Sequence, residues 1–197
     1  MELENNVCRD NMSVEIRQMT LNDVFPLMRM LLSLSKEDRK FFHPLPFKVW
    51  KLLPLLFYMS ISNKVVNYFR ILFPKLVFLS LISVNMQKQI TGFAYLKFLN
   101  KLPDGSYTAR LDHIIVFKDH RNMGIGSRLM NELISLTRIN NIKKITLTVR
   151  SENESAIRLY QKFGFETKNV TKNKEVWNEK FYSNYDMKLI LEKMMEN

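Results

Sequence analysis

Cysteine, histidine and glycine are scarce in the 197-residue sequence. The single cysteine, Cys8, excludes an intramolecular disulfide and a multi-cysteine metal site. The three histidines, His43, His113 and His120, lack the four-residue spacing by which two histidines on one helix face bind zinc. We therefore expect no disulfide and no resident metal.

Long hydrophobic runs are absent as well. The most apolar stretches, Leu52–Asn63 and Leu76–Gln87, each have only twelve residues without a charge, whereas a membrane-spanning helix needs about 20. The first residues, MELENNVCRDN, are polar and contain no secretory apolar run. These absences predict a cytoplasmic protein.

The overall composition indicates one globular domain. Apolar residues make up 46% of the chain and charged residues 25%, which are ordinary values for a folded protein and argue against disorder. We expect a single domain over residues 1–197, with a tail at 1–12 and a helical segment at 36–75.

The chain is strongly basic. Thirty lysine and arginine residues against nineteen aspartate and glutamate residues give a net charge of +11, so the molecule should attract anions. The lysines are scattered, and no helix-turn-helix, zinc-finger or RNA-recognition pattern occurs. A nucleic-acid-binding protein is therefore the alternative that we do not favour.

Hydrophobic patterning predicts a mixed α/β domain. Strands are expected over Val14–Met19, Leu76–Val84, Ile90–Phe98, Tyr107–Phe117, Lys144–Val149, Phe165–Val170 and Tyr185–Leu191, and helices over Leu21–Leu34, from Ile125 onward and over Asn153–Phe163. Four prolines between Phe41 and Pro74 predict broken helices there rather than one long helix. A polar, lysine-rich loop is expected between the last two strands.

Two of the five glycines, Gly124 and Gly126, stand in the sequence RNMGIG between a predicted strand and a predicted helix. Unpaired backbone N–H groups and the helix dipole favour an anion at such a position. Arg121 and Arg128 would add positive charge. These residues alone leave two interpretations open, a cradle for a phosphate group or a tight turn that binds nothing.

The segment Val149–Phe165, VRSENESAIRLYQKFGF, closely resembles the pattern N-x-x-A-x-x-L-Y-x-K-x-G-F of the GNAT superfamily of acetyl-coenzyme A-dependent N-acetyltransferases. Arg121-x-x-Gly124-x-Gly126 resembles the pyrophosphate loop of the same superfamily, and the two motifs follow in its order and spacing. The resemblance implies the GNAT fold, a mixed α/β sheet of about seven strands flanked by helices. The aromatic helical segment between the first helix and the second strand would be enlarged here.

The resemblance also implies acetyl-coenzyme A (acetyl-CoA) as co-substrate and direct acetyl transfer to a primary amine in a ternary complex. The acceptor would be a small amine or a protein N-terminus. Cofactor contacts are expected from strand residues Ile114, Ile115 and Val116, from loop residues Arg121, Asn122, Met123, Gly124, Ile125, Gly126 and Ser127, and from Asn153 and Tyr160. A homodimer and a non-catalytic module that binds coenzyme A stay open.

Tyr160 falls where the superfamily commonly has a general acid near the sulfur atom. The alternative is a buried tyrosine that packs against the sheet. Related acetyltransferases of ribosomal-protein N-termini carry a glutamate where this chain has Thr148, so a mechanism that uses that glutamate does not transfer.

Asp112 is the candidate general base, because strand alternation places it on the same face as Ile114 and Val116. The alternative is a charged residue at the solvent-facing start of the strand. His113 is expected on the opposite face, in a structural role.

Three interpretations apply to the aromatic segment Lys36–Lys75. It could form a lid over the acceptor with His43 near the chemistry, extra helices that pack on the sheet, or an amphipathic surface that touches anionic lipid. We favour the packing helices.

Overall fold

The computed structural model describes residues 14–42, 48–72, 78–177 and 180–191. The expected tail at 1–12 and His43 lie outside these residues. The seven strands form a single sheet, as the GNAT resemblance predicted, and their order is β1-β2-β3-β4-β5-β7-β6. They are β1 Glu15–Gln18, β2 Phe78–Val84, β3 Ile90–Lys101, β4 Tyr107–Val116, β5 Ile142–Arg150, β6 Glu166–Trp177 and β7 Lys180–Ile190.

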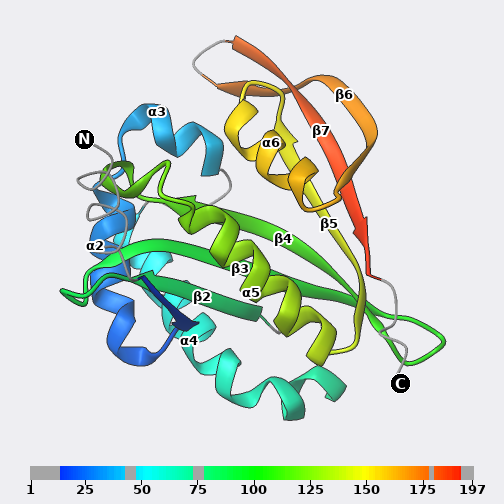
Figure 1. Ribbon diagram of the computed structural model, residues 1–197, viewed down its shortest axis with the longest axis horizontal. Helices are drawn as coiled ribbons and strands as arrows, with labels where there is room; N and C mark the ends of the chain where they lie inside the picture. The colour runs from blue at the N-terminus through cyan, green and yellow to red at the C-terminus, as the bar shows by residue number, and fades with distance from the viewer. Residues whose placement is uncertain (1–13, 43–47, 73–77, 178–179, 192–197) are drawn as a thin grey trace, which may run out of the picture.

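Helices cover both faces of the sheet (Figure 1). They are α2 Val24–Leu32, α3 Lys36–Arg39, α4 Val49–Leu72, α5 Ile125–Ile139 and α6 Glu154–Lys162, with short 3-10 turns at Leu21–Asp23, Lys40–Phe42 and Lys118–His120. The side chains of α2 and α4 form one hydrophobic core with the sheet. Those of α5, together with residues of α6, form a second core on the other face.

The expected hairpin of β2 and β3 is confirmed by antiparallel pairing from Phe78↔Lys97 to Val84↔Ile90. The helix after β5 is confirmed as well. The Asn153 side chain accepts a hydrogen bond from the Ala156 N–H at 3.3 Å and caps the start of α6. Gly164, with φ of +83°, follows its end.

The expectation of broken helices between Phe41 and Pro74 is wrong for the described part, because α4 runs unbroken across Pro54. A proline inside a helix costs about 3 kcal/mol. On the inner face, Leu52, Leu56 and Met59 are each 0% exposed, and burying such a side chain contributes about 1.5–3 kcal/mol. Together these three outweigh the proline. Packing of this segment on the sheet, the interpretation that we favoured, is thereby observed for α4.

The polar loop expected between the last two strands is also wrong. β6 and β7 remain paired as far as Trp177↔Lys180 and form one long antiparallel hairpin. The antiparallel ladder is made by backbone groups, so it does not require apolar side chains. The polar segment between Val170 and Tyr185 therefore forms strands, although it lacks the apolar pattern by which strands are predicted.

Gly92 allows β3 to lie close to β4 and α5. A Cβ atom at this position would come within 2.8 Å of the Ile115 carbonyl oxygen and of Ser83 Oγ, and within 3.1 Å of Leu129 Cδ1. Such distances are shorter than normal packing contacts. The sequence alone offered no role for this glycine.

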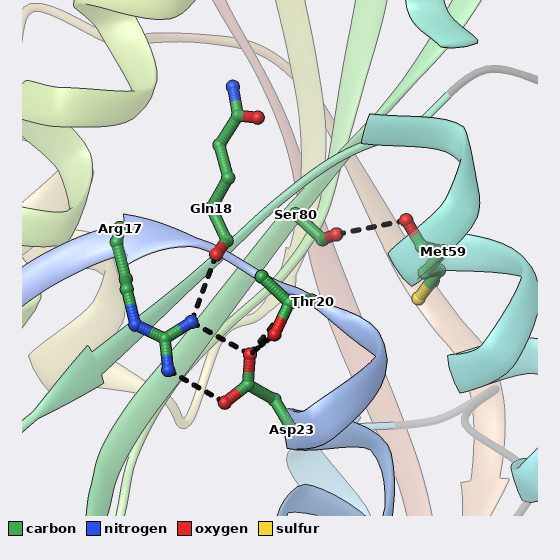
Figure 2. A network of polar contacts seen from close by, with 6 residues as sticks. All are labelled: Arg17, Gln18, Thr20, Asp23, Met59 and Ser80. Atoms are coloured by element: carbon green, nitrogen blue, oxygen red, sulfur yellow. Dashed lines mark hydrogen bonds and ion pairs between the residues drawn. The ribbon is translucent and has the colours of Figure 1, made fainter. Parts of the chain in front are cut away.

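A polar network fixes the connection from β1 to α2, and Figure 2 shows its members. The Arg17 guanidinium donates to both carboxylate oxygens of Asp23, at 2.7 and 2.8 Å. The Thr20 hydroxyl and backbone N–H donate to the same carboxylate at 2.7 and 2.8 Å. Burial raises the pKa of Asp23, but the hydrogen bonds from Arg17 and Thr20 outweigh it, so the pKa is lowered.

Candidate active site

The site lies where the sheet opens between β4 and β5. These two parallel strands pair only from Tyr107↔Ile142 to Arg110↔Thr146. Beyond this point they separate, and Figure 1 shows them diverging toward α3 and α6. The divergence leaves room for a ligand in the middle of the sheet.

Two cavities of about 340 Å³ each occupy this opening. The first, which we call the loop cavity, is lined by Asp38, His120, Val116 and the start of α5. The second, which we call the base cavity, is lined by Asp112, His113, Arg150 and Tyr160. Residues that line both are Phe41, Phe42, Ile114, Asn153 and Ala156. The two cavities are therefore neighbouring parts of one cleft.

The loop cavity ends at the N-terminus of α5. Gly124 is the N-cap residue, with φ of +73°, a conformation that favours glycine. A Cβ atom there would have no atom within 4 Å. The first turn of α5 carries no acidic residue and no side-chain cap, so its N–H groups remain available to an anion.

The two arginines near this loop are held by protein groups. Arg121 Nη2 lies 2.8 Å from Asp38 Oδ1, and its Nε donates to the Val116 carbonyl at 3.1 Å. Arg128 donates to the Val14 carbonyl. Arg121 thus ties the loop to α3, and the positive end of α5 is the main attraction that the cavity offers to an anion.

Asp112 lies at an irregularity of β4. Tyr95 pairs with His113 and Leu96 pairs with Leu111, so Asp112 is the additional residue of a β-bulge. The bulge shifts the alternation of side chains. Asp112 and His113 both line the base cavity. The His113 ring packs against Tyr95 in the core beneath α4, whereas Ile114 and Val116 pack against the other core, so His113 lies opposite those two residues as expected.

The carboxyl group of Asp112 is partly buried, and burial raises its pKa. The positive charges of Arg110 and Lys97 act in the opposite direction but do not cancel the effect. Arg110 Nε lies 2.8 Å from Asp112 Oδ1. Asp112 is therefore a stronger base than an ordinary aspartate.

Tyr160 is 7% exposed, and its ring centroid lies 5.7 Å from that of Phe165. Burial raises the pKa of its phenol. It also lines the base cavity together with Asp112. From the sequence, Tyr160 was expected either to pack in the core or to lie near the chemistry. In the structure it is both buried and part of the cavity wall.

Most of the expected cofactor residues meet in the cleft. Ile114, Val116, Arg121, Asn122, Gly124, Ile125, Gly126, Ser127 and Asn153 line the loop cavity. Ile115 does not, because its side chain is 0% exposed and belongs to the core beneath α4. Met123 lines neither cavity.

Several cleft residues were missed by sequence reasoning. Phe41 and Phe42 form part of the wall of both cavities, and the Phe42 ring lies 6.1 Å from that of His113. Arg150 and Asn184 line the base cavity. In the sequence, the only sign that Phe41 and Phe42 could contribute to a site was their aromatic character. Asn184 comes from β7, where the sequence predicted a loop.

Comparison with known proteins identifies the family. The model of the Acetyltransferase (GNAT) family matches residues 54–165. This chain belongs to the GNAT family. The match includes β4, α5, β5 and α6, which form the cleft.

Individual relatives match over shorter lengths. N-alpha-acetyltransferase 50 from Danio rerio is 30% identical over 97 residues, which are 43% of this chain and 58% of that protein. A probable spermine N(1)-acetyltransferase from Bacillus subtilis subsp. natto is 31% identical over 80 residues, or 39% of this chain and 53% of that protein. The chain thus spans little more than half the length of these relatives.

The fold extends over most of the chain. The solved structure of spermidine N-acetyltransferase from Vibrio cholerae, in complex with CoA and spermine, superimposes with a TM-score of 0.70 at 19% identity. The superposition covers 91% of this chain and 96% of that one. It supports the arrangement of sheet and helices described above.

Proposed function

We propose that this protein is an N-acetyltransferase that moves an acetyl group from acetyl-CoA to a primary amine. The observation that carries the proposal is the continuity of the cleft. An anion-binding helix start lies at one end, and a partly buried carboxylate and a buried tyrosine lie at the other. Membership of the GNAT family and the acetyltransferase relatives support the same function.

The loop cavity suits the pyrophosphate of acetyl-CoA. The N–H groups of Ile125, Gly126 and Ser127 belong to the first turn of α5, where an anion is stabilised by about 0.3–2 kcal/mol through the helix dipole. The edge of β4 beyond Arg110 makes no ladder with β5. Its backbone groups could therefore hydrogen-bond the amide groups of the cofactor arm.

In the proposed reaction the acceptor ammonium first loses a proton to Asp112, directly or through water. The free amine then forms a bond to the thioester carbonyl carbon, and the carbon–sulfur bond breaks. The nitrogen loses its second proton as the amide forms, and the thiolate gains one. Asp112 returns its proton to solvent, so the products are an acetamide and coenzyme A as the thiol.

Tyr160 would act at the leaving sulfur. Because burial raises its pKa, the phenol stays protonated throughout the physiological range and can donate a hydrogen bond to the developing thiolate. Complete proton transfer to a thiolate would be unfavourable, since thiols are the stronger acids. We therefore assign Tyr160 the role of hydrogen-bond donor. The second proton of the nitrogen passes to solvent, and the thiolate takes its proton from solvent.

The charges around the base cavity bear on the acceptor. Lys40, Arg110 and Arg150 line it together with a single carboxylate, that of Asp112. A polyamine would bring several positive charges into this surrounding, which is unfavourable. We propose an acceptor whose amine is accompanied by neutral or anionic groups, such as a peptide N-terminus.

An acceptor panel tests the proposal. Peptides and spermidine are mixed with acetyl-CoA, and free thiol and the acetylated amine are both measured. We expect peptide acetylation, with turnover of spermidine at least tenfold slower, since a single charge pair near a protein surface contributes about 4 kcal/mol. Spermidine turnover that exceeds peptide turnover would contradict the acceptor class, whereas no acetylated amine at all would contradict the activity.

The role of Asp112 predicts a specific pH dependence. Activity should rise with pH through the raised pKa of Asp112 and then level off, and Asp112→Asn should lower kcat roughly 100-fold or more. Arg110→Gln removes a positive charge that lowers this pKa, so the acid limb should move to higher pH. An unchanged limb in the Arg110 variant would contradict the assignment of Asp112 as the base.

A further inference from the structure

The net positive charge of this protein arises in one part of the chain, because acidic residues are absent there. Between Arg39 and Pro103 there are ten lysine and arginine residues and no aspartate or glutamate. The remaining residues contain twenty basic and nineteen acidic side chains. Almost the entire net charge of +11 therefore belongs to one segment, which contains α4, β2 and β3.

The outer face of α4 is apolar. Trp50, Phe57 and Ile61 are 68%, 51% and 37% exposed, and Pro54 is exposed between them. These four residues are spaced four, three and four positions apart, so they lie along one side of the helix. We call them the outer stripe. The inner side of the same helix is buried on the sheet.

Apolar residues on both sides of a helix are typical of a helix that is covered on both sides. Lysines flank the outer stripe. Lys48 and Lys51 are exposed, and Lys51 Nζ lies 4.8 Å from the centroid of the Trp50 ring. Aromatic and aliphatic side chains bordered by lysines match the interface of an anionic bilayer, where the rings enter the boundary region and the ammonium groups meet the headgroups.

We propose that the outer stripe and its flanking lysines dock the protein on an anionic lipid surface. α4 covers one face of the sheet, whereas α5 covers the other (Figure 1). A bilayer against α4 would thus not lie over α5. In the described part of the chain, no helix is long and apolar enough to span a membrane, so the contact would be peripheral.

The composition of the outer stripe favours lipid over the other partners. A nucleic acid would use the same positive charge but gains little from Ile61 and Pro54, which have no aromatic ring for a base to stack on. A second copy of this chain would bring the same basic segment against itself, and like charges would repel. An anionic lipid surface offers hydrocarbon to the outer stripe and negative charge to the flanking lysines.

Vesicle co-sedimentation tests the proposal on the full chain. Vesicles of phosphatidylcholine alone are compared with vesicles that also contain phosphatidylserine. We expect binding to the anionic vesicles only, decreasing with added salt. Trp50→Ser combined with Phe57→Ser should lower the partition coefficient at least tenfold, because withdrawing even part of two large apolar side chains from the bilayer boundary removes at least this factor.

Matched control variants distinguish binding through this surface from non-specific binding to vesicles. Phe181→Ser removes an aromatic side chain that is 66% exposed on β7, and binding should not change. Lys48→Gln with Lys51→Gln should weaken binding roughly fivefold for each lysine. Arg158→Gln with Lys162→Gln, the same charge change on α6, should have a much smaller effect. Melting temperatures of all variants are measured to verify folding.

Three results would overturn the proposal. The first is no pelleting with anionic vesicles. The second is a dimer in analytical ultracentrifugation that the Phe57 substitution dissociates, which would make a second copy the occupant. The third is a single-stranded oligonucleotide that binds more tightly than the vesicles and is equally sensitive to the Trp50 and Phe57 substitutions. None of these results depends on acetyl transfer.

Discussion

Gly124 provides a sharp test of the anion site, because the chain contains a matched position. Gly124 and Gly105 have φ of +73° and +80°, and a Cβ atom at either would have no atom within 4 Å. Glutamate at both positions would therefore suffer the same backbone strain, about 1–2 kcal/mol. Only Gly124 lies at the N-terminus of α5.

The expected loss of affinity follows from the added charge. A carboxylate about 4 Å from a phosphate oxygen costs roughly 1 kcal/mol in water and roughly 4 kcal/mol near a protein surface. Gly124→Glu should therefore weaken acetyl-CoA binding by a factor of about ten to a thousand, whereas Gly105→Glu should leave it unchanged. Both variants should lose similar stability.

Isothermal titration calorimetry with acetyl-CoA gives the two affinities, and urea denaturation of the free proteins gives the two stabilities. An equal affinity for both variants would refute the placement of the pyrophosphate at α5. If Gly124→Glu lost much more stability than Gly105→Glu, the two positions would not be equivalent. The predicted difference in acetyl-CoA affinity would then no longer follow from the added charge alone.

Four further substitutions test the fold and the chemistry. Gly92→Ala should destabilise the protein by about 1–3 kcal/mol, because the new Cβ meets the Ile115 carbonyl at 2.8 Å. Gly126→Ala, whose Cβ would lie 3.5 Å from Leu159, should be neutral or stabilising by up to about 1 kcal/mol. Urea denaturation measures both. Asp23→Asn should cost about 1.5–3 kcal/mol near neutral pH. This contribution is present above the unfolded pKa of about 3.9 and is lost as the pH falls through the lower folded pKa, so the difference from wild type should shrink in acid. Tyr160→Phe should lower kcat roughly 10- to 100-fold with an unchanged KM for acetyl-CoA, as measured by thiol release.

The sequence predicted the parts of the fold that depend on local patterns. The helix predicted over Asn153–Phe163 is confirmed by α6, and Gly164 with a positive φ follows its end. The loop before α5 was also located correctly, since a glycine with positive φ does stand at its start. Local chemistry decides such features, so they can be read without a structure.

Features that depend on distant contacts could not be predicted. The continuity of α4 across Pro54 follows from burial against the sheet. The bulge at Asp112 follows from its register with β3, and alternation within β4 alone does not predict it. The ion pair between Asp38 and Arg121 joins residues 83 positions apart. No pattern within either segment indicates that partner.

The most direct test of the account is one reaction in which three quantities are followed together. Wild type and Asp112→Asn are incubated with acetyl-CoA and a peptide with a free N-terminus, and cofactor binding, thiol release and the acetylated peptide are measured. We predict saturable binding by both proteins, and equal amounts of thiol and acetylated peptide from wild type at a rate roughly 100-fold above that of the variant. Absence of acetyl-CoA binding by wild type, or thiol release without an acetylated amine, would contradict the assignment of this cleft as an N-acetyltransferase site.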